Sequence, residues 1–318
     1  MKKLIGYVAL AVALLMAGAC QKEASSGVAG EAVKMAFTVM VPDASATKTV
    51  SAGENTDVVY YEVWDEEFEQ RLFPYEGSMP NLAQVHGGVA EIVIDLVKDQ
   101  KFNLIFWAQN ASCKDEVYSW IDLKNINVDY SKFTEDQKDV YDAFYAVEED
   151  VMGDGQSRTI YLYRPFAQVN FCASEMSTPT LGPITLSGNT VTVSDVATRF
   201  NTLTGLGDVA VKNVSFSTED ALVSDETINV GGTDFSWVAM NYLLVPCPSV
   251  DKPAVNVTVS ADFLTNFGTV HQTVLNVPIQ RNYRTNIVGD LFSVGANLRI
   301  EVVPGFTGDK PTIEIIKQ

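Results

Sequence analysis

Two acidic clusters carry the side chains of this sequence that could do hydrolytic chemistry. Asp65-Glu66-Glu67 and Glu148-Glu149-Asp150 each bring carboxylates together, and a pair of carboxylates can act as the acid and the base of a glycosidase. That reaction requires a defined separation between two carboxyl groups, which spacing along a chain does not establish. The favoured interpretation of both clusters is a solvated loop face, and a hydrolase ranks last among the functions considered.

The sequence contains few residues that favour a metal site or a catalytic nucleophile. The only histidines, His86 and His271, lie far apart, and no nucleophile elbow, phosphate-binding loop or zinc-protease motif occurs. Asp150 and Asp154 could contribute to a calcium site, but the D-x-D-x-D-G spacing is missing, so a hairpin turn at Gly153-Asp154-Gly155 is favoured. We therefore predict no catalytic residue, no metal site and no cofactor.

Three cysteines follow the N-terminal region, namely Cys113, Cys172 and Cys247. None of them stands in a C-x-x-C or other metal-ligand spacing. An oxidising compartment would permit at most one disulfide and would leave one thiol over. The favoured alternative is three buried cysteines that act as small apolar side chains.

The N-terminus has the three-part form of a secretory signal. A lysine pair precedes an uncharged apolar run at residues 4–19, which is short for a membrane-spanning helix. The run ends in Ala17-Gly18-Ala19-Cys20, which resembles a bacterial lipobox. We predict a signal peptide over residues 1–19, lipid on Cys20 and a flexible tether over residues 20–32. An ordinary signal peptide with a chance cysteine is the alternative.

The charge balance excludes some partners. The chain has 318 residues, of which 22 are basic and 40 acidic, and its formal net charge is −18. Nucleic acid and anionic lipid both require a basic surface, so neither is expected to bind electrostatically. The sequence is 47% hydrophobic, which is enough to build a core.

Alternation of apolar and polar residues predicts many short strands, as in residues 33–41, where every second side chain is apolar. The expected strands cover residues 33–41, 58–64, 89–97, 102–108, 158–164, 166–173, 209–216, 237–245, 255–263, 269–279, 285–292 and 297–303. Two helices are also expected. One opens with a capping-box pattern at Thr134 and runs toward Phe144, and the other runs from Ser194 to a stop at Gly205.

These elements predict a mostly-β chain of two tandem β-sandwiches with one or two short helices. We place an N-terminal domain at residues 33–160 and a C-terminal domain at residues 161–318. Among the tryptophans, Trp107 and Trp237 lie in apolar strands and are expected in the core. Trp120 has polar neighbours and is the candidate ligand contact, for a glycan.

Several phrases taken together resemble the fimbrillin-like lipoproteins of Bacteroidetes, which form the type V pilin superfamily. In chain order, the phrases are NLIFWAQ at residues 103–109, DAFYA at 142–146, LYRPFAQVNF at 162–171 and VPIQRNYRTNIVGD at 277–290. The resemblance implies transthyretin-like sandwiches and no enzymatic activity. It also implies an assembly route in which a protease removes the first strand and a strand from another subunit replaces it.

Three segments of this sequence fit that assembly route. Residues 33–41 are the strand to be released, and Lys48 is the candidate cleavage site, which would make Thr49 the new first residue. The family's best-known members carry arginine at that site. Residues 312–316 could be a donor strand or simply the last strand of a sheet. An uncut, permanently folded lipoprotein is the alternative.

The sequence therefore predicts a lipid-anchored protein exposed on the cell outer membrane. Its expected role is a structural or accessory fimbrial subunit in adhesion. The expected partners are other fimbrial subunits through strand exchange, the membrane through lipid on Cys20, and host or microbial surface ligands. The alternative function is a monomeric surface lipoprotein that binds glycans.

Overall fold

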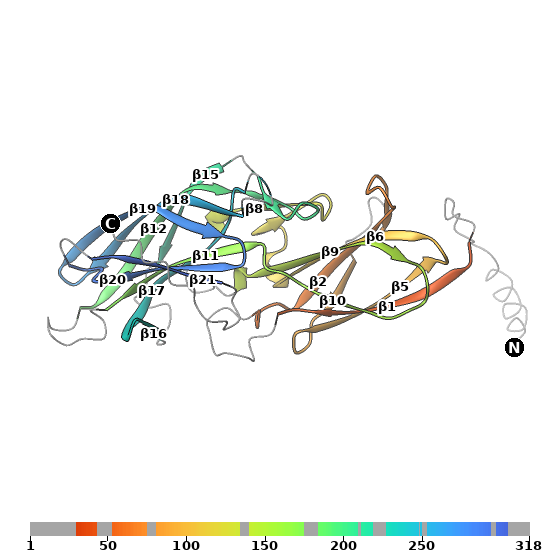
Figure 1. Ribbon diagram of the computed structural model, residues 1–318, viewed down its shortest axis with the longest axis horizontal. Helices are drawn as coiled ribbons and strands as arrows, with labels where there is room; N and C mark the ends of the chain where they lie inside the picture. The colour runs from red at the N-terminus through yellow and green to blue at the C-terminus, as the bar shows by residue number, and fades with distance from the viewer. Residues whose placement is uncertain are drawn as a thin grey trace, which may run out of the picture.

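The computed structural model shows an elongated molecule in which two β-rich lobes lie end to end along the long axis (Figure 1). Residues described by the structure are 30–42, 53–74, 81–133, 140–174, 184–208, 211–218, 227–247, 249, 253–293 and 297–304. No α-helix occurs among them; the short 3-10 helices η2 (Ala111–Cys113) and η3 (Tyr130–Lys132) are present. The prediction of a mostly-β, sandwich-type fold is confirmed.

The N-terminal lobe packs a three-stranded sheet against a five-stranded sheet. The three-stranded sheet has the order β10-β1-β5, with β1 (Ala32–Met40), β5 (Val89–Val97) and β10 (Arg158–Tyr161). The five-stranded sheet has the order β3-β2-β6-β9, with β4 beside β2; its strands are β2 (Val58–Trp64), β3 (Arg71–Phe73), β4 (Asn81–Gln84), β6 (Lys101–Gln109) and β9 (Ala143–Met152). Apolar side chains of both sheets fill the space between them.

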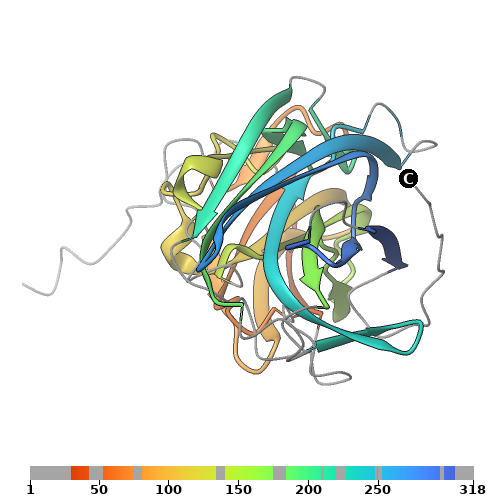
Figure 2. The ribbon, with the colours of Figure 1, turned by 90° about the vertical axis from the view of Figure 1, so that its left-hand side faces the viewer.

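The C-terminal lobe is built on one nine-stranded sheet whose long strands curve around a core (Figure 2). Its main path is β19-β18-β12-β17-β11-β20-β21, with β15 beside β12 and β16 beside β17. The strands are β11 (Phe166–Ala173), β12 (Leu186–Ala197), β15 (Val211–Thr218), β16 (Thr227–Val230), β17 (Thr233–Leu244), β18 (Ala254–Thr265), β19 (Gly268–Gln280), β20 (Tyr283–Gly289) and β21 (Arg299–Pro304).

A small sheet joins the two lobes. It has the order β14-β13-β8-β7, in which β7 (Tyr118–Ser119) and β8 (Asn125–Val128) come from the first half of the chain. Its other two strands, β13 (Arg199–Asn201) and β14 (Leu206–Gly207), come from the second half. One continuous apolar cluster also runs from the β2–β6 face of the N-terminal lobe into the C-terminal lobe. The division of the chain at residues 160 and 161 stays a prediction.

The alternating patterns located most strands because one face of each strand is buried. Along the predicted strand at residues 158–164, Ile160 and Leu162 are 1% and 3% exposed, whereas Tyr161 and Tyr163 are 62% and 60% exposed. Trp107 and Trp237 lie in the core, as predicted. The strand at β9 was not expected, and it contains the acidic cluster at residues 148–150, which is therefore on a strand and not in a loop.

The helix predicted from Ser194 to Gly205 is wrong, because these residues continue β12 and then form β13. A bulge at Asp195, whose φ is 55°, shifts the register between β12 and β15. This shift interrupts the two-residue alternation and produces a spacing that resembles a helical stripe. For the other helix, residues 134–139 lie outside the described residues, and Phe144 is already in β9.

Candidate functional site

The first candidate site is the seat of β1, defined as the space between β5 and β10 that β1 fills. All nine residues of β1 pair with β5 in antiparallel register, from Ala32 opposite Val97 to Met40 opposite Val89. On its other side, residues 37–40 pair with β10 in parallel. The strand predicted to leave is therefore a central strand with hydrogen-bonding neighbours on both sides.

The inward face of β1 is fully enclosed. Met35, Phe37 and Val39 are each 0% exposed, and Val41, just after the strand, is 3% exposed. The ring of Phe37 lies 6.2 Å from that of Phe106 on the opposing sheet, and the sulfur of Met35 accepts a hydrogen bond from the backbone N–H of Gly155 at 3.1 Å. Burial of four apolar side chains stabilises the lobe by on the order of 10 kcal/mol.

The outward face of β1 makes only surface contacts. Lys34 pairs with Asp95 of β5 at 3.2 Å, and both side chains are mostly exposed. The hydroxyl of Thr38 donates to the carboxylate of Glu91 at 3.0 Å. Exposed interactions of this kind contribute little to stability, so the attachment of β1 depends on its backbone pairing and its inward side chains.

The chain leaves β1 through Val41, whose backbone N–H donates to the carbonyl of Gly88 at 2.8 Å. It is described again from Gly53, which lies against Val41 and Phe144. The candidate cleavage site, Lys48 and Thr49, lies outside the described residues, as do Cys20 and residues 312–316. Their roles stay predictions.

Trp120 is half-buried at the edge of the large core. Its ring meets Tyr60 edge to face, with centroids 5.1 Å apart, and the Lys114 ammonium lies 4.3 Å from the ring centre. Tyr60 and Lys114 therefore already occupy part of its surface. The role of Trp120 as a ligand contact stays a prediction.

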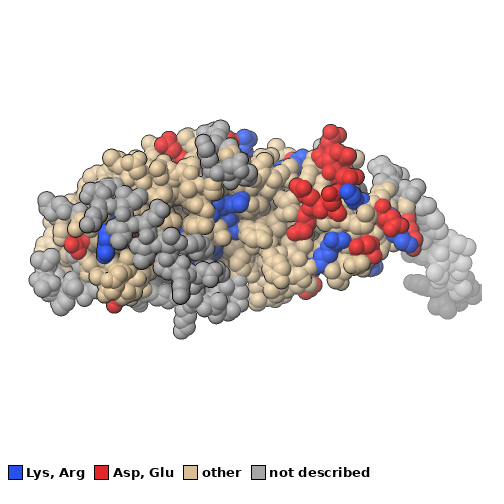
Figure 3. Space-filling model, in the orientation of Figure 1, with Lys and Arg blue, Asp and Glu red and all other residues tan. Residues whose placement is uncertain are grey.

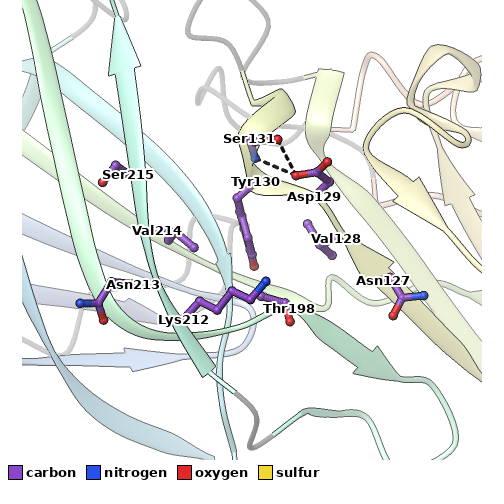
Figure 4. Close-up of a pocket in the computed structure, with 10 residues that line it drawn as sticks. All are labelled: Asn127, Val128, Asp129, Tyr130, Ser131, Thr198, Lys212, Asn213, Val214 and Ser215. Atoms are coloured by element: carbon purple, nitrogen blue, oxygen red, sulfur yellow. Dashed lines mark hydrogen bonds between the residues drawn. The ribbon is translucent and has the colours of Figure 1, made fainter.

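A second candidate site, here called the junction pocket, opens between the small sheet and β15 of the C-terminal lobe, with a volume of about 550 Å³ (Figure 4). One wall comes from β8 and η3 and the other from β15, with a residue of the β12–β13 turn between them. The pocket is lined by Asn127, Val128, Asp129, Tyr130, Ser131, Thr198, Lys212, Asn213, Val214 and Ser215. Its volume lies within the range of ligand sites, which often form where domains meet.

Local hydrogen bonds hold the η3 wall of the junction pocket in place. The Asp129 carboxylate accepts from the backbone N–H and the hydroxyl of Ser131, at 3.0 and 2.7 Å. The Ser131 hydroxyl bond is the main reason that the pKa of Asp129 is lowered. Tyr130 fixes this wall to the C-terminal lobe, because its hydroxyl donates to the Ala197 carbonyl of β12 and accepts from the Leu244 N–H of β17. Burial raises the pKa of that hydroxyl.

Among the described residues, the two acidic clusters meet at one lysine. Lys101 pairs with Asp150 of one cluster at 2.8 Å and with Glu66 of the other at 3.5 Å, while Asp154 pairs with Arg158 at 3.2 Å. No group of three or more potential metal ligands occurs among the described residues. His271 pairs with Asp262 on the surface at 2.7 Å.

The thiols of Cys113, Cys172 and Cys247 are all free and buried. The interpretation of these residues as small apolar side chains is confirmed. Burial raises the pKa of Cys113 to about 11, and it also raises the pKa of Cys172. Both shifts favour the protonated thiol, which is the less nucleophilic form.

Sequence reasoning missed the junction pocket completely. Its two walls are about eighty residues apart in the chain and meet only after folding, when η3 packs against β15. The Asp-x-Ser spacing at Asp129 and Ser131 is a turn signal that could have located η3. No sequence signal relates this turn to Lys212.

Within the described part of the chain, no helix is long and apolar enough to cross a membrane.

One protein family matches a stretch of the sequence that includes both lobes. Residues 26–316 match the Family of unknown function (DUF6562). The chain belongs to this family. The DUF6562 match includes the β1 seat and the junction pocket, so both are parts of the family's own region. No curated protein matches the sequence.

Solved structures with a similar course of the chain come from Bacteroidetes. A Bacteroides ovatus protein provisionally assigned to cell adhesion has 13% identity and a TM-score of 0.48, over 92% of this chain and 100% of its own. A fimbrial assembly protein from Parabacteroides distasonis has 12% identity and a TM-score of 0.42, over 90% and 100%. The fimbrial anchor protein Mfa2 from Porphyromonas gingivalis has 12% identity and a TM-score of 0.42, over 90% and 99%. The sequence phrases predicted a resemblance to proteins of this kind.

Proposed function

We propose that this chain is a non-enzymatic subunit of a surface fimbria that acts in adhesion. Lipid on Cys20 would hold the uncut chain at the outer membrane; cleavage after Lys48 would remove Cys20 together with β1, and strand exchange at the β1 seat would then join the trimmed chain to other subunits. The observation that carries the proposal is the position of β1, a buried central strand that comes directly after the tether and before Lys48. The fimbrillin-like phrases of the sequence support the same function.

The energetics of the seat explain why cleavage would lead to assembly. Loss of β1 would expose the inward side chains of β5 and β10, such as Ile92, Ile94 and Ile160, which are at most 4% exposed in the intact chain. It would also leave unpaired backbone groups along both strands. The burial lost is comparable with the whole stability of a typical domain, so an empty seat is unstable and strongly favours any strand that fits.

The seat also defines the strand that it would accept. An incoming segment has to run antiparallel to β5 and parallel to β10, as β1 does. Every second side chain must be apolar and able to fill the positions of Met35, Phe37 and Val39. Strand addition of this kind obtains affinity from main-chain hydrogen bonds and specificity from the alternate pockets.

Limited digestion of the purified full chain with a lysine-specific protease tests this function. We expect a new N-terminus at Thr49, release of the β1 segment and the appearance of polymers on size-exclusion chromatography. A synthetic peptide of residues 32–42 in excess should refill the seat and block the polymers. The same peptide with Phe37→Asp should not block them.

Lys48→Gln is the matched control, because it leaves β1 and its seat unchanged. This variant should stay monomeric under the same digestion. The proposal is wrong if the chain trimmed at Thr49 remains folded and monomeric at high concentration, or if Lys48→Gln polymerises as readily as the unchanged protein.

A further inference from the structure

We propose that the junction pocket binds a short neutral oligosaccharide. This inference goes beyond strand exchange, because the pocket shares no residue with the β1 seat. Strand β8 of the small sheet and η3 form one side of the pocket, and β15 of the nine-stranded sheet forms the other (Figure 4).

The middle of the pocket is apolar. Val128, Tyr130 and Val214 line it, and their side chains are 6%, 6% and 7% exposed. The phenol ring of Tyr130 is held in place because its hydroxyl bonds to backbone groups of the C-terminal lobe at 2.8 and 3.0 Å. Phe133 and Phe216 pack against the Tyr130 ring, with centroids 5.1 and 5.9 Å away, so the apolar centre offers a ligand a small and rigid contact area.

The periphery of the pocket is polar, and several of its groups have capacity left for a ligand. Among the described residues, the Lys212 ammonium has no acidic side chain within ion-pair distance. The Asn213 carbonyl oxygen accepts from the Asp195 N–H at 3.3 Å, which leaves its amide N–H groups available. On the opposite side, Asn127 donates to the Ser119 carbonyl at 3.3 Å, which leaves its own oxygen available.

The Asp129 carboxylate adds acceptor capacity. Ser131 bonds one of its oxygens, and the other has no partner among the described residues. The pocket therefore presents donors and acceptors around an apolar centre. Each hydroxyl of a sugar is both a donor and an acceptor, so vicinal hydroxyls match this mixture better than a ligand with only donors or only acceptors.

The charges of the lining favour a neutral ligand. Lys212 and Asp129 are the two charged side chains in the lining, and they have opposite signs. A strongly anionic ligand would gain from Lys212 but would be repelled by Asp129, and a cationic ligand would meet the opposite problem. A peptide strand added along β15 would need pockets for alternate apolar side chains, whereas most of the remaining lining is polar.

An array of neutral and acidic oligosaccharides, probed with the purified full chain, tests this proposal. We expect binding to one or more neutral oligosaccharides, which titration calorimetry should then confirm in solution. Lys212→Met keeps the side-chain length but removes the donor, and Asp129→Asn removes the charge of the acceptor. Each change should weaken binding by about tenfold or more.

Lys101→Met is the matched control, because it removes a lysine on β6 that pairs with Asp150 and lies outside the pocket. It should leave the affinity unchanged, and thermal unfolding should verify that all variants are folded. The proposal is overturned if no oligosaccharide binds, if only acidic oligosaccharides bind, or if Lys212→Met and Asp129→Asn bind as tightly as the unchanged chain.

Discussion

At the scale of single residues, the buried pair of Asp142 and Arg164 stands out. The Arg164 Nε donates to Asp142 Oδ1 at 2.7 Å, and the side chains are 1% and 3% exposed. Burial raises the pKa of Asp142, and Arg164 opposes that rise. Removal of either partner leaves a charge without compensation in a low-dielectric interior.

We therefore predict that Arg164→Met lowers the free energy of unfolding by about 3–5 kcal/mol, as measured by urea denaturation. The exposed pair of Lys34 and Asp95 provides the control. Lys34→Met should cost at most about 1 kcal/mol. Equal losses for the two variants would show that the buried pair has no special weight.

Cys113 allows a prediction about pH. Its thiol donates to the Val140 carbonyl at 3.3 Å, and burial raises its pKa from 9.0 to about 11. At pH 8 we expect no reaction of Cys113, Cys172 or Cys247 with a thiol reagent in the folded protein, and reaction of all three in urea. Fast labelling of the folded chain at any of these positions would contradict their burial.

The raised pKa of Cys113 also has a consequence for stability. Between pH 9 and 11 the unfolded chain loses this proton while the folded chain keeps it, so the contribution of Cys113 to stability is lost as the pH rises. Cys113→Ala should be less sensitive to pH over that interval. An identical pH dependence of the free energy of unfolding for this variant and the unchanged protein would contradict the shift.

At the scale of secondary-structure elements, β1 should depend on its inward face. Phe37→Ala removes a ring that is 0% exposed and should lower the free energy of unfolding by about 3–5 kcal/mol. Thr38→Ala, on the outward face of the same strand, loses one exposed hydrogen bond and should cost at most about 1 kcal/mol. Urea denaturation measures both, and a larger loss for Thr38→Ala would reverse the assigned faces.

Most strands could be predicted from the sequence because burial of one sheet face leaves a two-residue alternation. The alternation fails at β12, where the bulge at Asp195 changes the register, and the resulting spacing was misinterpreted as helical. It is also weak in β9, whose first four residues are all buried and whose residues 148–150 are all acidic. These deviations depend on pairing with distant strands, which local pattern does not contain.

The candidate sites differ in the same way. The β1 seat could be predicted because β1 follows the expected tether directly. The inward side chains of β1 are also consecutive alternate residues of one short segment, so the local sequence pattern is enough to identify them. The junction pocket could not, because Asn127 and Lys212 come together only after β8 pairs with β13 and β15 pairs with β12. Sites formed by such long-range pairing require the fold before they can be located.

At the scale of the whole molecule, one of the apolar clusters spans both lobes. Phe200 of the junction sheet is 1% exposed, and its ring lies 4.7 Å from that of Tyr145 and 6.4 Å from that of Trp107. The Arg281 side chain of the second half also donates to the Tyr145 hydroxyl and the Gly205 carbonyl. The lobes should therefore behave as one cooperative unit.

Differential scanning calorimetry should show a single unfolding transition for the full chain. Phe200→Ala should shift the transition to lower temperature, with a loss of about 3–5 kcal/mol in the free energy of unfolding. Phe267→Ala is the control, because this ring is 72% exposed at the turn between β18 and β19. Two separate transitions in the unchanged protein would contradict a shared core.

The acidic surface of the chain does not itself favour association between copies, so the proposed contacts between subunits have to come from strand pairing. On the face shown in Figure 3, acidic side chains gather over the N-terminal lobe, and the net charge of the chain is −18. Such a surface keeps the exterior soluble and repels copies at long range. Under the proposed function, association therefore requires the specific apolar fit of a strand in the β1 seat.

N-terminal sequencing of the protein recovered from the cell surface, in separate monomer and polymer fractions, tests strand exchange most directly. The proposed function predicts that the assembled copies begin at Thr49 and have lost their own β1. Assembled copies that all begin at lipid-bearing Cys20, with β1 still attached, would contradict it.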